Sequence, residues 1–380
     1  MAEPFKNLIN RTTVQAASRH LKRAWPAFDD RRFEGLALDG LEALELKARA
    51  LHLCRALEAT LPPAFADAAD VIEATLAPPR ADPDAPEPVE ATNDDGGLVG
   101  WVVWPLAEYV ACRGIDTPQR ALTALHALTQ RFTAEWAIRP FIERHPALVF
   151  ATLHEWSRDA SPHVRRLVSE GSRPRLPWGL QLKGLIADPA PTLPLLAALQ
   201  DDTSPYVRRS VANHLNDIAK DHPALIAQWL AQHLPDASPE RRALLRHASR
   251  TLIKRGDAQV LKAWGLGQRL KGSATLALSR KRVVLGDQGL ELAVTLQSTS
   301  PRTQRLVVDY AVHHVKANGA TAPKVFKGWS IELGPRASLA LRKKHAVRPI
   351  TTRTYHAGRH EIDLRVNGEI VARAFFDLRI

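Results

Sequence analysis

A basic segment that occurs twice decides the fold of this chain: Ser161-Pro162-His163-Val164-Arg165-Arg166 and, 43 residues later, Ser204-Pro205-Tyr206-Val207-Arg208-Arg209. This spacing is typical of helical repeats. Serine can cap a helix and proline fits its first turn, so each segment is predicted to begin a helix that carries the paired arginines. The partner helix of each hairpin should lie upstream. We therefore expect stacked hairpins that present one curved, cationic wall.

Further repeats extend this pattern over the first 265 residues. His145-Pro146-Ala147-Leu148 returns as His222-Pro223-Ala224-Leu225, and Ser238-Pro239-Glu240-Arg241-Arg242 resembles a shortened third copy of the basic segment. Apolar residues recur at spacings of three and four, which predicts helices. These stretches are 5–28, 33–61, 118–130 and 223–234. We expect five or six HEAT-like helical hairpins.

One segment interrupts the helical pattern. Residues 78–97 contain four prolines after Pro78 and six acidic residues against the single Arg80. Such a composition predicts an acidic loop or linker within the helical region.

The last 110 residues have a different sequence pattern, one that is typical of β-strands. Short alternating runs such as 290–296 and 304–310 are separated by glycine-containing turns, which predicts six to eight strands in an immunoglobulin-like β-sandwich. The boundary should fall near residues 265 to 273, giving a HEAT-like domain at 1–268 and a sandwich at 269–380. The fold class is thus multidomain, an α-helical solenoid followed by a β-sandwich.

The charge of the chain indicates a polyanionic partner. The 380 residues carry a net charge of +12, and residues 271–380 contain 19 Lys/Arg against 8 Asp/Glu. A basic surplus favours binding to phosphates, and it sits mostly in the sandwich. Two cysteines without a CxxC motif suggest a reducing compartment. We find neither a secretory signal nor a membrane-spanning run, so we expect a soluble, cytoplasmic protein.

Three acidic residues lie near the arginines of the repeats. At about 100° per residue, Glu170 and Asp217 share a helix face with Arg166 and Arg209. Glu135, one hairpin earlier, is a third candidate. A carboxylate in a phosphate-binding cleft repels the ligand that its neighbours attract, so it requires a functional reason.

Ordinary structural roles are open alternatives for these residues. Each acid has a basic residue three or four positions away, so each could form a helix-surface ion pair worth a few tenths of a kcal/mol. The arginine pairs could be the solvated face of a HEAT helix. Trp136, Trp156 and Trp178 could belong to the core.

Three long motifs resemble the signatures of the AlkC family of bacterial alkylpurine DNA glycosylases. The motifs are Arg131-Phe132-Thr133-Ala134-Glu135-Trp136-Ala137-Ile138-Arg139-Pro140-Phe141, Val164-Arg165-Arg166-Leu167-Val168-Ser169-Glu170-Gly171-Ser172-Arg173-Pro174-Arg175-Leu176-Pro177-Trp178, and Tyr206-Val207-Arg208-Arg209-Ser210-Val211-Ala212-Asn213-His214-Leu215-Asn216-Asp217. The resemblance covers essentially the whole chain, because one AlkC subtype has a C-terminal immunoglobulin-like domain. The related AlkD proteins have the solenoid alone.

This resemblance implies a HEAT-like superhelix that holds duplex DNA and releases cationic alkylated bases such as 3-methyladenine and 3-methylcytosine. It implies that Glu135, Glu170 and Asp217 form an acidic cluster beside the lesion and that Trp178 packs against the damaged nucleotide. Trp136 stands where many relatives carry phenylalanine, so lesion contact and packing are both open for it. Candidate DNA-backbone contacts are Arg131, Arg139, Arg165, Arg166, Arg173, Arg175, Arg208 and Arg209.

The chemistry of the acids is consistent with this activity. A purine methylated at N3 already carries positive charge, so the leaving group needs little acid assistance. Carboxylates can stabilise an oxocarbenium-like sugar and orient or deprotonate the attacking water. An indole face also favours cations. Whereas most base-processing enzymes extrude their target, the resemblance implies that here the base is not flipped.

No cofactor is expected, because the chain has no metal-ligand spacing and no glycine-rich phosphate loop. The protein is predicted to act as a monomer. The sandwich could clasp DNA, contact a protein or stabilise the last repeat, and its charge favours the clasp. Its candidate phosphate contacts are Lys281, Arg282, Arg342, Lys343, Lys344, Arg353 and Arg359. The alternative function is a non-catalytic HEAT module that binds distorted nucleic acid or a protein.

Overall fold

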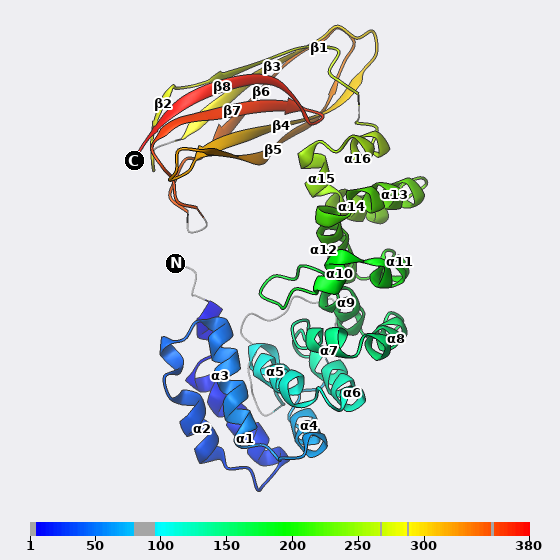
Figure 1. The fold of residues 1–380 in the computed structure, drawn as a ribbon, viewed down its shortest axis with the longest axis vertical. Coiled ribbons are helices and arrows are strands. Elements are labelled where there is room, and N and C mark those ends of the chain that lie inside the picture. The colour runs from blue at the N-terminus through cyan, green and yellow to red at the C-terminus, as the bar shows by residue number, and fades with distance from the viewer. Residues whose placement is uncertain (1–4, 80–95, 267, 287–288, 351–352) are drawn as a thin grey trace. The chain divides into compact units, whose positions relative to one another are not determined.

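The computed structural model describes residues 5–79, 96–266, 268–286, 289–350 and 353–380. They form two compact units, Met1–Asp221 and His222–Ile380, which are described separately below. The helical pattern fills the first unit and the start of the second, and the strands follow (Figure 1). This order of helices and then strands confirms the predicted fold class.

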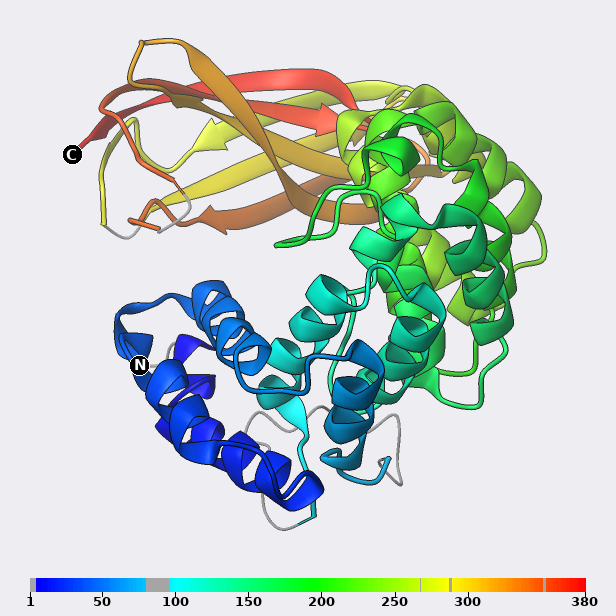
Figure 2. The same cartoon turned by 60° about the horizontal axis from the view of Figure 1, so that its bottom comes forward.

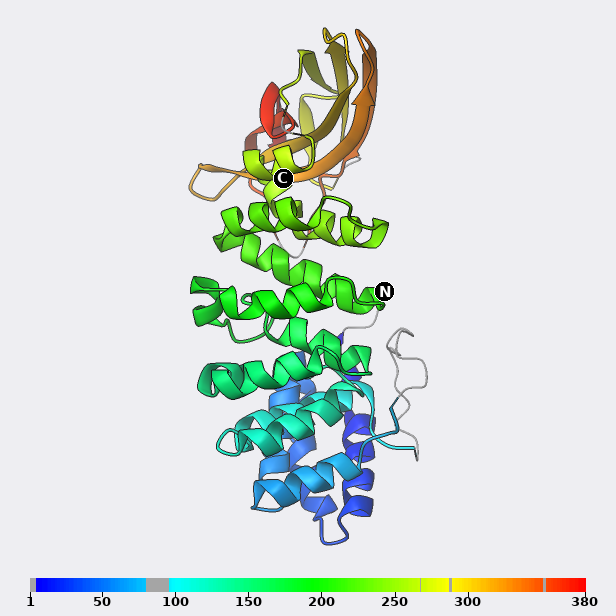
Figure 3. The ribbon, with the colours of Figure 1, turned by 90° about the vertical axis from the view of Figure 1, so that its right-hand side faces the viewer.

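The first unit consists of helices joined by short connections. Its α-helices are α1 Arg11–Ala24, α2 Asp30–Leu38, α3 Leu46–Glu58, α4 Phe65–Ala74, α5 Val103–Arg113, α6 Pro118–Thr129, α7 Arg139–Arg144, α8 Pro146–Trp156, α9 Pro162–Gly171, α10 Lys183–Ala187, α11 Leu193–Leu199 and α12 Pro205–Asp221, and its 3-10 helices are Phe5–Leu8, Leu41–Ala43, Gly100–Val102 and Ala190–Thr192. Seen from the side, the helices coloured blue to green lie in successive layers (Figure 3). The helical stretch predicted over 33–61 is divided into α2 and α3, and Gly40 adopts a left-handed φ of 67° between them.

The repeated basic segments begin helices as expected. Pro162 is at the start of α9 and Pro205 is the first residue of α12, where a missing N–H costs nothing. The capping differs between copies, since Ser161 makes no side-chain capping bond whereas the Ser204 hydroxyl accepts from Tyr206 N at 3.3 Å. Helix α9 packs on α8 and α12 packs on α11, so each segment is the second helix of a hairpin.

The predicted acidic loop falls largely on residues 80–95, which lie outside the described part of the chain. Its flanks are described and are held together. Ala77 N donates to Leu98 O at 3.1 Å, and Leu98 N donates to Thr75 O at 2.8 Å. The two flanks of the segment therefore lie side by side.

The second unit begins with four helices and continues as a β-sandwich. The helices are α13 Pro223–His233, α14 Pro239–Ala248, α15 Arg250–Arg255 and α16 Ala258–Ala263, and the strands are β1 Gly272–Leu278, β2 Arg282–Val284, β3 Leu290–Ser298, β4 Gln304–Val315, β5 Thr321–Leu333, β6 Ser338–His345, β7 Gly358–Val366 and β8 Glu369–Arg379. One sheet has the order β1-β3-β6 and the other β2-β8-β7-β4-β5. The strands, coloured yellow to red, are seen from a second side in Figure 2. Within the described residues this is eight strands, in agreement with the prediction.

Alternating apolar residues explain the packing of the two sheets. On β3, Leu292, Val294 and Leu296 are buried and point to one face, opposite Val308 on β4 and Leu364 on β7. This alternation is typical of an antiparallel sheet with one buried face. Among the described helices, none combines the length and the apolarity needed to cross a membrane.

Candidate active site

The three predicted acids lie in the first unit and are almost fully buried. Glu170 is in α9 and Asp217 is in α12, whereas Glu135 is in the turn between α6 and α7. Their exposed fractions are 5%, 2% and 7% respectively. Ionised carboxylates are rarely so buried unless they are paired, so their partners are decisive.

Two arginines join the three carboxylates. Arg166 bridges the first two, with its Nη1 2.6 Å from Glu135 Oε2 and its Nη2 3.7 Å from Glu170 Oε1. Arg173 bridges the next two, because its Nη1 pairs with Glu170 Oε1 and its Nε and Nη2 each lie 2.8 Å from Asp217 Oδ2. Residues from three successive layers of the unit thus form one connected series of ion pairs.

A lysine ends this series, and hydroxyl groups complete the bonding of its carboxylates. Lys220 Nζ lies 2.8 Å from Asp217 Oδ1. The Thr133 hydroxyl donates to Glu135 at 2.7 Å, and the Ser210 hydroxyl donates to Glu170 at 2.6 Å. We call the alternating ions the charge row: Glu135, Arg166, Glu170, Arg173, Asp217 and Lys220.

The charge row keeps Glu170 ionised. Burial raises the pKa of this carboxyl, but Arg166, Arg173 and the Ser210 hydroxyl outweigh that effect and hold the pKa below its ordinary value of 4.5. The site therefore offers a carboxylate, and not a carboxylic acid, at neutral pH. Buried ion pairs contribute little net stability compared with apolar side chains of similar size, so a functional explanation is favoured.

Ion pairing on a helix surface does not explain these acids. The i,i+4 and i,i+3 pairs of Glu170 do form, but they are buried and shared with neighbouring acids. Glu135 does not lie in a helix at all. The arginines at its i−4 and i+4 positions, Arg131 and Arg139, donate instead to backbone carbonyls.

The first arginine of each basic segment donates hydrogen bonds to backbone carbonyls just before the start of its own helix. Arg165 Nη1 donates to the carbonyls of Asp159 and Ala160, and Arg208 Nη1 donates to those at the equivalent positions 202 and 203. Arg165 also pairs with Asp202 at 2.6 Å. The second arginine differs between the copies: Arg166 belongs to the charge row, whereas Arg209 is exposed.

The remaining predicted DNA contacts occupy varied environments. Arg139 is fully buried and donates to the carbonyls of Gly171, Arg173 and Leu180, which makes it part of the frame of the site. Burial lowers its pKa to about 10. Arg175, by contrast, forms a bidentate pair with Asp221, both distances being 2.8 Å, and remains accessible.

Trp178, in the segment between α9 and α10, is an exposed aromatic residue. Its exposed fraction is 60%, and its φ of 62° is unusual for a bulky residue and costs about 1–3 kcal/mol. Its ring stacks on Trp136 at 6.4 Å, and Trp136 stacks on the buried Trp104 at 4.4 Å. Trp136 therefore connects the exposed indole to the core. Strained, exposed residues of this kind are typical of functional sites.

Sequence reasoning did not single out His214, which is fully buried beside the row. Its Nδ1 lies 2.9 Å from Ser169 O, and burial lowers its pKa from 6.5 to about 4. The imidazole is thus neutral at pH 7. Only its place on the α12 face between Ser210 and Asp217 could have indicated it from sequence.

This pKa predicts how stability changes with pH. Between about pH 6.5 and 4 the unfolded chain binds a proton at His214 that the folded chain does not, so falling pH should remove up to about 3 kcal/mol of stability. We expect the variant His214→Asn, which keeps a donor for Ser169 O, to lose less stability over this range in urea unfolding. The exposed-histidine variant His154→Asn is the matched control. Equal pH dependence for His214→Asn and the wild type would contradict the assignment.

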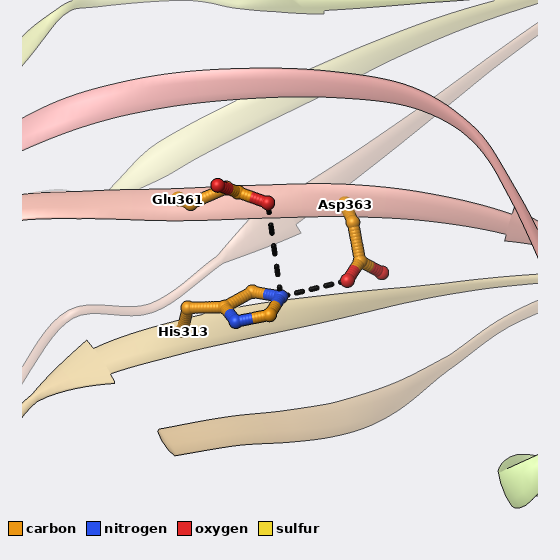
Figure 4. A group of neighbouring side chains, drawn as sticks. All are labelled: His313, Glu361 and Asp363. Atoms are coloured by element: carbon orange, nitrogen blue, oxygen red, sulfur yellow. Dashed lines mark hydrogen bonds and ion pairs between the residues drawn. The ribbon is translucent and has the colours of Figure 1, made fainter. Parts of the chain in front are cut away.

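Among the described residues, one group in the second unit has the composition of a metal site. Ligand atoms of His313, Glu361 and Asp363 lie within 4.8 Å of one another on strands β4 and β7 (Figure 4). Both oxygens of Asp363, however, accept hydrogen bonds from Arg365, at 2.7 and 2.9 Å. Because the Arg365 guanidinium already neutralises this carboxylate and His313 Nε2 lies 2.7 Å from its Oδ2, pairing among protein groups explains the cluster. Ligand spacing along one strand could not have revealed it.

The predicted phosphate contacts of the sandwich divide into paired and accessible residues. Arg342 pairs with Glu291 at 3.0 Å, Lys343 donates to Lys327 O at 2.8 Å, and Arg353 contacts His314. A second group is exposed on the described surface, and its members are Lys281, Arg282, Lys344 and Arg359. Of these, Lys281 and Arg359 line one groove together with Phe375, over which the Arg359 guanidinium lies at 4.4 Å.

Comparisons with known proteins agree with this architecture. A protein-family model described as the C-terminal Ig-like domain of uncharacterised protein YhaZ matches residues 272–380. The uncharacterized protein YhaZ of Bacillus subtilis (strain 168) is 34% identical over 372 residues, which are 96% of this chain and 97% of the relative.

A solved structure is similar over its whole length. It is the alkylpurine DNA glycosylase AlkC of Pseudomonas fluorescens bound to DNA containing an abasic site analog. The two chains are 35% identical, the TM-score is 0.89, and the match covers 100% of each. The chain therefore belongs to the AlkC family of alkylpurine DNA glycosylases, in the subtype with a C-terminal immunoglobulin-like domain.

Proposed function

We propose that this protein is a DNA glycosylase of base excision repair that hydrolyses the N-glycosidic bond of cationic alkylated bases in duplex DNA. The observation that carries the proposal is the charge row, which buries three carboxylates in the unit that also carries the exposed Trp178, whose ring stacks on Trp136, the neighbour of Glu135 in the chain. The similarity to an AlkC structure bound to DNA containing an abasic site analog supports it, because base release leaves an abasic site. The substrates we propose are 3-methyladenine, 3-methylcytosine and similar lesions.

The reaction follows from the charges of substrate and site. A base methylated at N3 carries a positive charge, so the electrons of the breaking C1′–N bond neutralise it as it leaves. The positive charge then develops on the deoxyribose. Carboxylates held ionised stabilise that charge most strongly in the transition state. Water adds to C1′, and its proton passes to a carboxylate or to solvent.

The residues have different parts in this proposal. Glu135, Glu170 and Asp217 act on the sugar and the water, while Arg166 and Arg173 hold the three side chains in place. Trp178 packs against the damaged nucleotide, and because it is exposed it can do so without enclosing the base. We therefore propose that the base is not flipped. Backbone contacts come from the accessible cations of this face, Arg175, Arg209 and Lys220.

The domain assignment follows the same division of roles. We propose that residues 1–268 form the glycosylase domain and that 269–380 contact DNA through the exposed cations of the sandwich. Residues 269–380 contain 20 Lys/Arg against 8 Asp/Glu, and this basic surplus supports the role. Contacts to phosphates carry no sequence information and serve to position the duplex.

The experiment that tests the function is a base-release assay with the intact chain. Duplex DNA treated with a methylating agent should yield free 3-methyladenine and 3-methylcytosine, identified by mass spectrometry, whereas a duplex with a neutral lesion such as uracil should yield no base. The reason is that a neutral base lacks the activated leaving group. A protein that binds the alkylated duplex but releases no base would be the non-catalytic module and would contradict the proposal.

A further inference from the structure

Trp178 is held in an unfavourable conformation by residues outside its own loop. Its φ of 62° lies in the left-handed region, and its indole is mostly exposed, so burial of the ring does not compensate for the backbone strain. The loop that carries it runs from the end of α9 to α10. Other contacts must therefore fix this residue.

Two side chains donate hydrogen bonds to the two peptide groups on either side of Trp178. Lys47 Nζ, at the start of α3, donates to Trp178 O at 2.8 Å. Trp136 Nε1 donates to Pro177 O at 3.1 Å. Rotation of these peptide planes defines φ and ψ of Trp178. Two donors that orient both carbonyls thus fix the backbone at this residue.

The ring contacts reinforce the backbone contacts. The Trp136 ring lies between Trp178 and Trp104, and the Trp104 indole donates to Glu108 at 2.8 Å. Gly179 allows the close approach, because a Cβ there would lie 3.2 Å from Trp136 Cδ1. The loop backbone at Gly179 thus lies directly against the ring of Trp136.

We propose that Lys47 and Trp136 are positioning residues that hold Trp178 in its left-handed conformation, so that its indole is in place before DNA arrives. The proposal rests on the function given above, in which Trp178 meets the damaged nucleotide. Neither residue needs to touch the substrate. Each acts by raising the fraction of molecules whose loop is competent, which lowers the cost of reaching the reactive complex.

The kinetic test uses variants that remove one donor each. Lys47→Met keeps the length of the side chain, and Trp136→Phe keeps an aromatic ring. For each we expect single-turnover release of 3-methyladenine to fall about tenfold, as loss of roughly one hydrogen bond allows. Affinity for an undamaged duplex should change by less than about twofold. Lys6→Met, which removes an exposed ion pair with Glu45 in the same region, is the matched control and should be unchanged.

A double-mutant comparison separates positioning from a general structural role. Glycine accepts positive φ, so Trp178→Gly removes both the indole and the need for restraint. In that background Lys47→Met should have no further effect on release. The proposal is overturned if Lys47→Met leaves the wild-type rate unchanged, or if it lowers the rate equally with and without Trp178.

A measurement without DNA keeps this proposal distinct from the proposed function. The indole N–H resonance of Trp178, identified by its loss in Trp178→Phe, should shift or broaden in Lys47→Met and stay in place in Lys6→Met. If the intact chain releases no base but this resonance responds as expected, the proposed function fails and the restraint of Trp178 stands. An unperturbed resonance in Lys47→Met overturns the restraint itself.

Discussion

Replacing Asp217 by asparagine should reduce release of 3-methyladenine from alkylated duplex DNA by at least about 100-fold, the usual effect of removing one group that stabilises transition-state charge. Asparagine keeps the shape of the side chain but removes the charge that faces the developing cation. Glu135→Gln and Glu170→Gln should have effects of similar size. Affinity for duplex DNA should be retained or improved in all three, because a negative charge near the phosphates is lost.

Single-turnover release and fluorescence-anisotropy binding to the same duplex measure these two effects. Glu143→Gln is the matched control, since this glutamate is exposed on α7. Urea unfolding of each variant establishes that it is folded under the assay conditions. Persistence of release in all three acid variants would show that the acids of the charge row are not catalytic.

Replacing Arg139 by methionine should lower the free energy of unfolding by at least about 3 kcal/mol. The guanidinium is fully buried and donates to Leu180 O at 2.6 Å and to Gly171 O and Arg173 O at 2.8 Å each. Methionine fills much of the volume but leaves all three carbonyls without this donor. Lysine should not restore stability, because one ammonium cannot reproduce a planar fork of donors.

Urea unfolding followed by the helical circular-dichroism signal measures this loss. Arg144→Met, an exposed arginine on the same helix, should change stability by less than about 0.5 kcal/mol. If Arg139→Met remained as stable as Arg144→Met but lost affinity for DNA, Arg139 would be a DNA contact, as its motif first suggested, and not part of the frame.

The fold could be predicted from the sequence because its signals are periodic and local. The 43-residue repeat, the prolines at helix starts and the alternation on β3 each act through neighbours in the chain. The break between helices at Gly40 could not be predicted, because the apolar spacing continues through it. The spacing of side chains carries no information on the positive φ that Gly40 adopts.

The candidate acids and their local partners could be named from sequence, but their long-range partners could not. The pairs Glu170–Arg173 and Asp217–Lys220 are three residues apart, whereas Arg166 reaches Glu135 from another layer of the unit. The same limit applies to Lys47, which lies 131 residues from the carbonyl it binds. The sequence does not tell whether an arginine is buried against backbone carbonyls or exposed to a ligand. Arg139 is buried and Arg209 is exposed, and only the structure distinguishes them.

The alternation of the charge row limits how this site can evolve. Arg166 and Arg173 each contact two acids, so losing any one acid leaves an arginine with half of its counter-charge in a buried place. Loss of Asp217 removes one of the two acids of Arg173 and the acid of Lys220, whereas loss of Arg173 leaves Glu170 and Asp217 with one fewer cation between them. Neighbouring positions of the row should therefore change together, and a relative that has abandoned the chemistry should have lost ions in pairs.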